Sequence, residues 1–258
     1  MELNGKRIIV TGCARGMGEA TLKAYVSAGA KVVGMDVADE SGKSVVETAN
    51  QVGPGKAEYM HVDVSDRQSV EASFARAVDW LGGLDVLAHP AAIQRSSSAT
   101  DVTVEDWDLM FAVNVRGTML TNQVAHRHMK SSGGGSIINF GSISGLRPEV
   151  SAAAYSAAKG AVHSWTRTAA GTWGADNVRV NAILPAIATP MYLEAMARAT
   201  EEQKVAIYWQ NLQSIVLGNK YGDPDRDFAP VMVFMASDSS RFMTGQLIPV
   251  DGGQANVR

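Results

Sequence analysis

The chain has 258 residues, 46% of them hydrophobic, and a formal net charge of −3 at pH 7. This length suits one domain with a large core, and the interspersed charges give no basic surface for nucleic acid or an anionic membrane. No stretch approaches the ~18 uninterrupted apolar residues of a membrane span, and we find no secretory signal. The single cysteine, Cys13, cannot form an intrachain disulfide. We therefore expect a cytoplasmic protein that binds neither nucleic acid nor membrane.

Short runs rich in Val and Ile alternate with helical patterns along the whole chain. The predicted strands lie at 7–11, 31–35, 57–62, 85–89, 136–140, 178–184 and 247–250, and the predicted helices at 17–28, 40–52, 66–81, 104–131, 152–173 and 226–236. Strands that are apolar on both faces, separated by helix-length crossovers, indicate a parallel sheet covered on both sides. We expect an α/β fold, a doubly wound seven-stranded parallel sheet in a single domain, with ligands at the carboxyl ends of the strands.

A glycine-rich turn, TGCARGMG, follows the first predicted strand. Its glycines permit a tight turn and let backbone N–H groups approach a pyrophosphate at a helix N-terminus. The spacing, Gly-xxx-Gly-x-Gly, differs from the usual Gly-x-Gly-xx-Gly, so the position between a strand and a helix is what indicates a dinucleotide. A turn that serves only strand-to-helix packing is the alternative. The predicted cofactor-binding residues here are Gly12, Arg15, Gly16, Met17 and Gly18.

Asp36 ends the second predicted strand. A carboxylate there can accept hydrogen bonds from the ribose hydroxyls and repel a 2′-phosphate, which favours NAD over NADP. Two alternatives stay open: Arg15 could pair with a phosphate, and Asp36 could cap the helix that begins near Glu40. We predict NAD as the cofactor.

Tyr155 and Lys159 lie four residues apart on a predicted helix. Their side chains therefore share one face, about 5–6 Å apart at Cβ. An ammonium beside a phenol favours the phenolate, so we expect the pKa of Tyr155 to fall below its usual value of about 10. Such pairs also arise by chance on exposed helices. Ser142 strengthens the interpretation because it follows the fifth strand, at the same sheet edge as the glycine turn.

The segment 191–221 interrupts the alternation because it contains no strand. We expect helices and a loop there, forming a lid at about 190–221 over the strand ends. Its larger side chains either line an apolar substrate pocket or form only the packing face of a helix: Met191, Tyr192, Met196, Tyr208 and Trp209.

Together these motifs resemble the short-chain dehydrogenase/reductase family over essentially the whole chain. The shared features occur in the family's order: TGCARGMG, Asp63 in HVDVSD, Asn114 in FAVNV, Ser142 in IINFGSISG, YSAAK and TGQLIPVDGG. The resemblance implies a Rossmann-type fold and a nicotinamide cofactor. It also implies a homotetramer in which the helices at 104–131 and 152–173 pack between subunits.

The resemblance also implies catalytic roles. Tyr155 would give or take the proton of the substrate hydroxyl, while Ser142 holds the carbonyl oxygen. Lys159 would bind the nicotinamide ribose and lower the pKa of Tyr155, and Asn114 would hold a water that connects the lysine to solvent. Two such positioned donors would meet the charge that develops on the substrate oxygen.

Further contacts complete the predicted site. By resemblance, Asp63 and Val64 would contact the adenine ring and Thr189 the nicotinamide carboxamide. The other predicted cofactor contacts are Pro90, Ala91, Tyr155, Lys159, Pro185 and Ile187. The predicted substrate contacts are Ile93, Ser144, Ala186, Tyr192 and Met196. No pattern of metal ligands is present, so we expect no metal.

The chain departs from the family pattern at two places. Where the family carries Asn-Asn-Ala-Gly after strand four, the sequence reads His89, Pro90, Ala91, Ala92. Proline cannot donate a hydrogen bond between strands, and we expect His89 to replace an asparagine as a hydrogen-bonding group. The usual Pro-Gly-xxx-Thr becomes PAIAT at 185–189, one residue shorter, so Thr189 could be displaced. Neither change touches the catalytic residues.

We therefore expect an NAD-dependent oxidoreductase that interconverts a secondary alcohol and a ketone. Because of the two departures from the family pattern, we expect weakened or readjusted cofactor contacts. The apolar lid suggests a moderately bulky apolar substrate, such as a cyclic, steroid-like or aromatic ketone. An NADP-linked 3-oxoacyl thioester reductase and a non-catalytic dinucleotide sensor are the alternatives.

Overall fold

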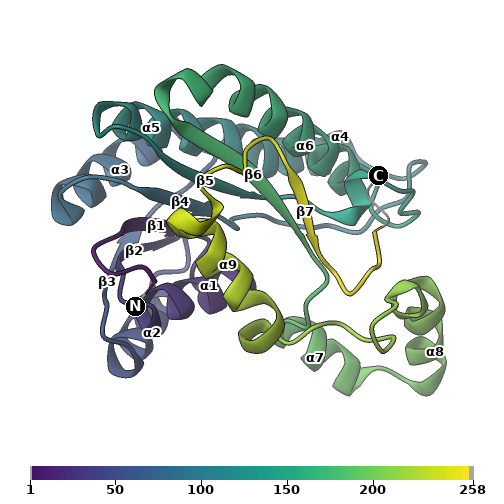
Figure 1. Cartoon of the computed structure of the whole chain (residues 1–258). Coiled ribbons are helices and arrows are strands. Elements are labelled where there is room, and N and C mark those ends of the chain that lie inside the picture. Colours follow the sequence, from purple (N-terminus) through teal and green to yellow (C-terminus); the bar gives the residue numbers. More distant parts are fainter. Residues whose placement is uncertain (1, 256–258) are drawn as a thin grey trace.

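Seven parallel strands form the centre of the protein, in the order β3-β2-β1-β4-β5-β6-β7 (Figure 1). The computed structural model describes residues 2–255. The strands are β1 (Arg7–Thr11), β2 (Lys31–Asp36), β3 (Lys56–His61), β4 (Val86–His89), β5 (Gly135–Phe140), β6 (Val178–Pro185) and β7 (Leu247–Val250). The strand order reverses between β1 and β4, and doubly wound folds bind ligands at such a switch point. The predicted fold class is confirmed.

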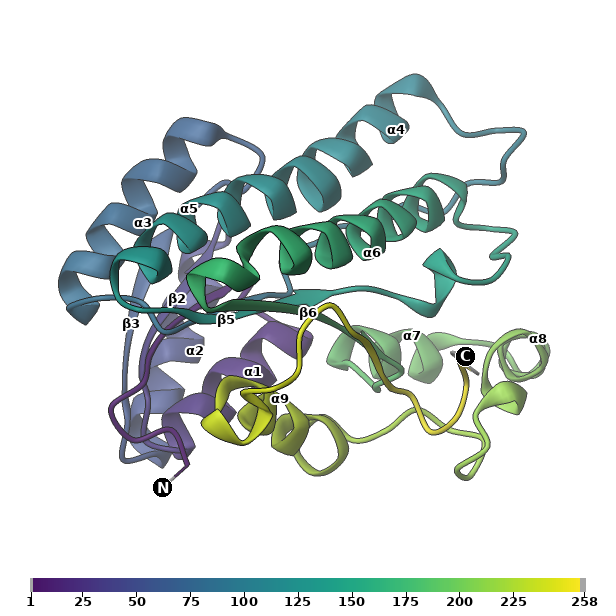
Figure 2. The same cartoon turned by 45° about the horizontal axis from the view of Figure 1, so that its top comes forward.

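Helices cover both faces of the sheet, as Figure 2 shows from a second direction. The α-helices are α1 (Gly16–Ser27), α2 (Asp39–Val52), α3 (Arg67–Leu81), α4 (Val104–Met110), α5 (Gly117–Ser131), α6 (Ala153–Trp173), α7 (Pro190–Arg198), α8 (Glu201–Gln210) and α9 (Ala229–Ala236). Helices α1, α2 and α9 contribute to one apolar core and α3, α5 and α6 to the other. Successive side chains of β1 point to opposite faces of the sheet, so Ile8 and Val10 pack in one core and Ile9 packs in the other.

The helix predicted at 104–131 is not continuous, so the prediction was wrong for the middle of this range. A π-helical segment, η1 (Phe111–Arg116), separates α4 from α5. At the centre of this segment the side chain of Asn114 forms hydrogen bonds with the backbone of Ile93. The backbone carbonyl of Asn114 accepts a hydrogen bond from the hydroxyl of Thr118 at 2.7 Å. Insertion of one residue into a helix in this way is frequent at functional sites. A second π-helical segment, η5 (Pro224–Phe228), precedes α9.

The segment that follows β6 contains the predicted helices, α7 and α8 (Figure 1). Tyr192 packs edge-on against Tyr221, with ring centres 4.7 Å apart. Trp209 exposes 62% of its surface and Tyr208 exposes 38%, so neither is enclosed in a pocket. The side chain of Met191 lies outside the described residues. Within residues 2–255 no helix has the length and apolarity that a membrane crossing requires.

Candidate active site

The glycine turn after β1 leaves no room for a side chain at Gly12 or at Gly18. Gly12 and Gly16 adopt φ values of +63° and +60°, which favour glycine. A Cβ atom on Gly12 would lie 2.6 Å from the Cα of Ala91, and one on Gly18 would lie 1.9 Å from the carbonyl oxygen of Gly12. The turn therefore packs directly on the segment after β4, and its backbone borders the sheet edge where a dinucleotide would bind.

Asp36, at the end of β2, is tied to this turn. Its Oδ2 accepts a hydrogen bond from the Ala14 amide at 3.0 Å, and its Oδ1 accepts one from the Ala38 amide at 3.0 Å. The N-cap of α2 is Ala38 and not Asp36, so the capping alternative was wrong. Arg15 is exposed in the same turn. The two charged groups that would influence the choice between NAD and NADP are therefore both in or next to the glycine turn.

The residues expected to meet the adenine follow β3. Oδ1 of Asp63 accepts hydrogen bonds from the amide and the hydroxyl of Ser65, at 2.8 and 2.7 Å. Val64 is buried, and a Cβ on Gly117 would lie 3.0 Å from its Cγ2. Met17, in the glycine turn, packs against the core that contains β1.

Lys159 is buried next to Tyr155 on α6. Its Nζ donates a hydrogen bond to the carbonyl of Phe140 at 2.8 Å and lies 5.5 Å from the centre of the Tyr155 ring. Burial lowers the pKa of Lys159 from 10.5 to about 8. The pairing predicted from their spacing is present.

The direction expected for Tyr155 was wrong. Burial raises the pKa of Tyr155 above its ordinary value, and the hydrogen bond with Ser142 only partly opposes this. The ammonium of Lys159 faces the ring and the Phe140 carbonyl, so desolvation of the phenolate dominates. The phenol of Tyr155 is therefore protonated at neutral pH.

Ser142 begins the turn after β5 and is held from two sides. Its Oγ accepts a hydrogen bond from the amide of Ser144 at 3.1 Å and lies 3.2 Å from the Ser144 hydroxyl. Its own amide donates to Nε2 of His163 at 3.3 Å. Burial lowers the pKa of His163 to about 4, so the imidazole is neutral and can accept this bond.

His163 was missed by the sequence reasoning. It lies on α6 beneath the turn, and Cβ atoms on Gly141 and Gly145 would come within 2.5 and 2.7 Å of its ring. The two glycines on either side of Ser142 were the available signal, because they indicate that a bulky group packs closely against the turn.

Comparison with known proteins agrees with this geometry. A family model described as enoyl-(acyl carrier protein) reductase matches residues 12–255. The chain is 34% identical over 254 residues to 3-oxoacyl-(acyl-carrier-protein) reductase of Thermotoga maritima, covering 98% of this chain and 99% of that protein. The chain belongs to the short-chain dehydrogenase/reductase family.

Two further relatives support this assignment. This chain is 36% identical over 252 residues to 2,5-dichloro-2,5-cyclohexadiene-1,4-diol dehydrogenase of Sphingobium indicum. The match covers 97% of this chain and 96% of that protein. The crystal structure of a short-chain type dehydrogenase/reductase from Mycobacterium marinum matches with a TM-score of 0.88 and 30% identity, over 99% and 98% of the two chains. The family is thus shown over nearly the whole length.

The unusual His-Pro-Ala-Ala segment of this short-chain dehydrogenase/reductase begins at the last residue of β4, and Nε2 of its histidine is buried without a partner among the described residues. His89 is 2% exposed, and its Nδ1 lies 2.7 Å from the hydroxyl of Thr11 and 3.3 Å from that of Thr121. This confirms the expectation that His89 acts as a hydrogen-bonding group. Burial lowers its pKa to about 3, so the ring is neutral. Ala92, by contrast, is exposed.

The shortened segment after β6 still reaches the glycine turn. A Cβ on Gly16 would lie 3.6 Å from Cγ2 of Thr189, whose Oγ1 accepts a hydrogen bond from the Tyr192 amide and so caps α7. The side chain of Ile187 is buried in the core, which leaves its backbone at the strand end. Ala186 is buried beside it, and Pro185 ends β6.

Two further residues of the predicted site, Asn114 and Met196, lie on η1 and on α7. The Asn114 side chain is 1% exposed and bonds to both the amide and the carbonyl of Ile93 at 2.9 Å. Met196 is partly buried on α7. Within residues 2–255 no cluster of His, Cys, Asp or Glu could hold a metal ion.

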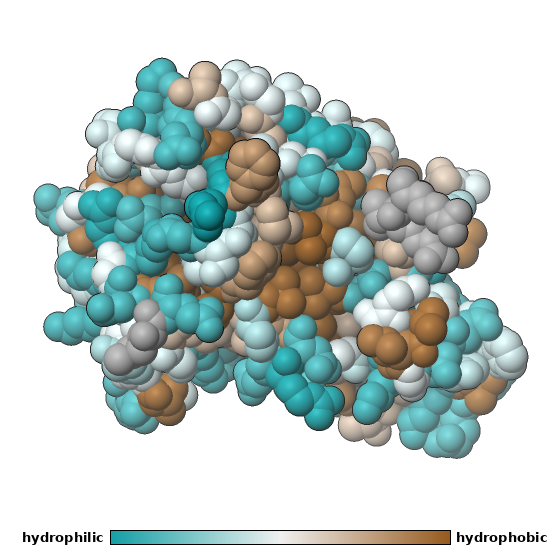
Figure 3. Space-filling model, viewed as in Figure 1, coloured by the Kyte–Doolittle hydropathy of each residue, from teal (hydrophilic) through white to brown (hydrophobic). Residues whose placement is uncertain are grey.

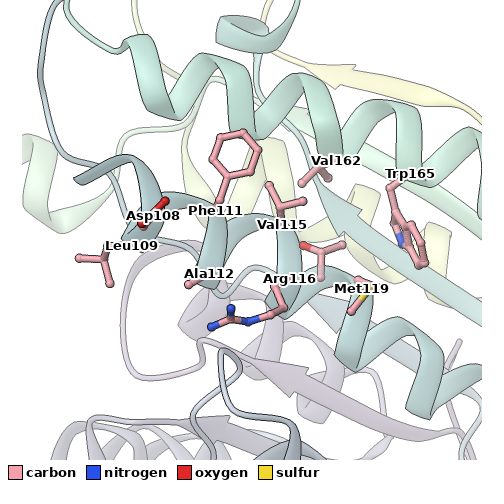
Figure 4. Close-up of a pocket in the computed structure, with 10 residues that line it drawn as sticks. Asp108, Leu109, Phe111, Ala112, Val115, Arg116, Met119, Val162 and Trp165 are labelled. Atoms are coloured by element: carbon pink, nitrogen blue, oxygen red, sulfur yellow. The ribbon is translucent and has the colours of Figure 1, made fainter. Parts of the chain in front are cut away.

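A cavity of about 850 Å³ borders η1, and none of the predicted catalytic residues lines it. Figure 4 shows its lining, which comes from α4, η1, α5 and α6. The lining residues are mostly apolar: Asp108, Leu109, Phe111, Ala112, Val115, Arg116, Thr118, Met119, Val162 and Trp165. None of the predicted cofactor or substrate contacts lines it.

Proposed function

We propose that the protein is an NAD-dependent dehydrogenase that interconverts a secondary alcohol and a ketone. The observation that carries the proposal is the assembly of Ser142, Tyr155 and Lys159 at the carboxyl edge of the sheet, beside the glycine turn and Asp36. The residues fit a dinucleotide, because the turn has space only for backbone at Gly12 and Gly18. NAD bound here would accept or supply the hydride.

The proton would move at Tyr155. In alcohol oxidation Oη of Tyr155 takes the hydroxyl proton, and in ketone reduction it returns a proton to the carbonyl oxygen. Ser142 would hold the same oxygen, since its hydroxyl is oriented by the Ser144 amide. Lys159, held by the Phe140 carbonyl, places a positive charge next to the ring.

Asn114 would lie at the solvent end of the path by which protons reach Lys159. Its position within a π-helical segment moves its backbone out of the regular α-helical hydrogen-bond pattern. We propose that a water bound near Asn114 connects Lys159 to solvent. The side chain of Asn114 is fully engaged with Ile93 and therefore fixes this part of the site.

Asp36 supports NAD over NADP. Its carboxylate keeps lone pairs for ribose hydroxyls after accepting from the two amides, and its charge would repel a 2′-phosphate. Arg15 lies in the same turn and is exposed, so it is the residue that would favour NADP.

The substrate proposed is a moderately bulky cyclic alcohol or ketone. Tyr192 and Tyr221 form an aromatic pair beside α7, and one relative is named for a cyclohexadiene diol. A 3-oxoacyl thioester, reduced with NADP, is the second candidate because another relative is named for that reaction.

We propose a homotetramer as the assembled form. Two separate apolar surfaces support it. One borders the cavity between α4 and α6 (Figure 4). The other lies near the edge strand β7, where Figure 3 shows apolar side chains gathered in the middle of the face. Phe242, which precedes β7 in the chain, is fully exposed. Two different two-fold interfaces generate a tetramer of dihedral symmetry.

One experiment tests the activity directly. Binding of NAD and NADP is measured by calorimetry, and turnover of cyclic secondary alcohols and of a 3-oxoacyl thioester is followed by nicotinamide absorbance, with Tyr155→Phe as the matched control. Turnover of alcohols with NAD that is lost in Tyr155→Phe supports the proposal. Binding without turnover in either protein would instead support a dinucleotide sensor, and preferred turnover of the thioester with NADP would support the second candidate.

A further inference from the structure

Arg147 has few partners for a partly buried arginine. Arg7, Arg147 and Arg179 are partly buried, whereas the other described arginines are exposed. Arg7 binds Asp85 through two of its nitrogens, and Arg179 makes three hydrogen bonds to two carbonyls and a hydroxyl. The guanidinium of Arg147 makes one long hydrogen bond, at 3.4 Å to the hydroxyl of Ser214, and its buried Nε has no partner among the described residues.

The backbone fixes Arg147 close to the catalytic serine. Ser142 caps the short 3₁₀ turn Ile143–Gly145, and the amide of Arg147 donates to the carbonyl of Ile143 at 3.1 Å. Arg147 thus follows the serine by one compact turn. On its other side, Ser214 belongs to the segment after α8, and Nε2 of Gln254 donates to the same hydroxyl at 3.2 Å. The guanidinium lies where the serine turn meets the lid.

The side chains near Arg147 include a pair of tyrosines but no carboxylate that forms an ion pair with it. Tyr221 lies near Arg147 and packs against Tyr192. The nearest acid along the turn, Glu149, accepts a hydrogen bond from Gln210 on α8 at 3.3 Å. Among the ion pairs of residues 2–255 none includes Arg147.

We propose that Arg147 binds a carboxylate of the substrate, at the end distant from the carbon on which Ser142 and Tyr155 act. The substrate is then a cyclic hydroxy acid or the corresponding oxo acid. This inference rests on the proposed dehydrogenase function and narrows its substrate class. One edge of a guanidinium, formed by Nε and a terminal nitrogen, binds a carboxylate through two parallel hydrogen bonds. In Arg147 the Nε atom at that edge is without a partner.

A matched substrate pair tests the inference by turnover. The pair is 3-hydroxycyclohexanecarboxylate and its methyl ester, which differ only in the charged group. We expect kcat/KM for the acid to fall roughly 10- to 100-fold in Arg147→Met, the usual scale for loss of a charged hydrogen bond, and to recover in part in Arg147→Lys. The ester should be unaffected. Arg95→Met, which removes an exposed arginine paired with Asp106, is the control.

Equal losses for acid and ester, or a wild type that does not prefer the acid, would overturn the inference and leave the dehydrogenase function intact. A binding measurement tests the inference even if the protein shows no turnover. Calorimetry compares cyclohexanecarboxylate with cyclohexanecarboxamide on the full-length protein and on Arg147→Met, with circular dichroism to confirm folding. Preferential binding of the carboxylate that is lost in the variant supports the inference even if no alcohol is oxidised. Equal or absent binding overturns it.

Discussion

The amide of Ser142 donates a hydrogen bond to Nε2 of His163, across 3.3 Å and from one element to another. Because Nε2 accepts, the ring proton is on Nδ1, and the low pKa of His163, about 4, keeps the ring neutral at physiological pH. His163 therefore holds the backbone of Ser142, the residue that we propose to be catalytic.

Replacing His163 should separate this positioning role from cofactor binding. In His163→Leu the partly buried Ser142 amide loses its acceptor, so we expect a loss of about 1–3 kcal/mol in the free energy of unfolding and a lower kcat. His163→Gln keeps an acceptor and should recover part of kcat. Urea unfolding and steady-state kinetics measure both effects, and calorimetry should show an unchanged Kd for NAD. Equal kcat in the Leu and Gln variants would contradict this role.

The bond between Thr11 and His89 predicts a second pair of variants. His89 aligns with Asn139 of β5 and lies beside Thr11 of β1, so a row of polar side chains crosses three strands near their carboxyl ends. We expect His89→Asn to retain most of the stability and His89→Leu to lose about 1–3 kcal/mol, because the Thr11 hydroxyl then lacks its partner. Denaturant unfolding of the two variants provides the measurement. Equal stabilities would show that the histidine acts through packing alone.

Local patterns in the sequence predicted the elements of the site, and tertiary contacts account for what was missed. The glycine turn, Asp36 and the Tyr155–Lys159 spacing are each read from a few neighbouring residues. The contact between Ser142 and His163 joins positions 21 residues apart, and no periodicity reports it. The pKa of Tyr155 was predicted in the wrong direction because the sequence identifies its partner, while burial depends on the whole fold.

Gly12→Ala should abolish NAD binding. Residue 12 has φ +63°, and a Cβ there would collide with the backbone of Ala91 at 2.6 Å, so both strain and a shifted turn are expected. Gly171→Ala is the matched control, because its Cβ would meet nothing within 4 Å on helix α6 and should stabilise the helix by about 0.5–1 kcal/mol. Calorimetry with NAD and thermal unfolding of both variants test this. Undiminished NAD affinity in Gly12→Ala would contradict the proposed cofactor path.

The proposed assembly predicts that a charge at the α4–α6 surface reduces the oligomer size. Leu109 lines the cavity of Figure 4 and is 36% exposed, so Leu109→Glu should leave the fold intact while burying an unpaired charge in the interface. Val52→Glu, at an exposed position at the end of α2, is the control. Light scattering coupled to size-exclusion chromatography measures the mass. A monomeric wild type, or a Leu109→Glu variant that keeps the full mass, would refute this interface.

Burial of Lys159 predicts a specific dependence of stability on pH. Its pKa is about 8 in the folded protein and 10.5 as the ordinary value. Below pH 8 both states carry the proton, and the cost of burying the charge is fully present. Between these values the unfolded state binds more protons, so the Lys159 contribution to the free energy of unfolding rises with pH.

The rise should total about 3 kcal/mol at 1.36 kcal/mol per pKa unit. It is measured as the difference in unfolding free energy between wild type and Lys159→Met, followed from pH 7 to 10.5, because groups that titrate alike in both proteins cancel. Lys43→Met removes an exposed lysine and serves as the matched control. We expect the difference to change in favour of the wild type as the pH increases. A flat difference would mean that Lys159 keeps its proton in the folded state as readily as in the unfolded chain, so that the carbonyl of Phe140 fully compensates the cost of its burial.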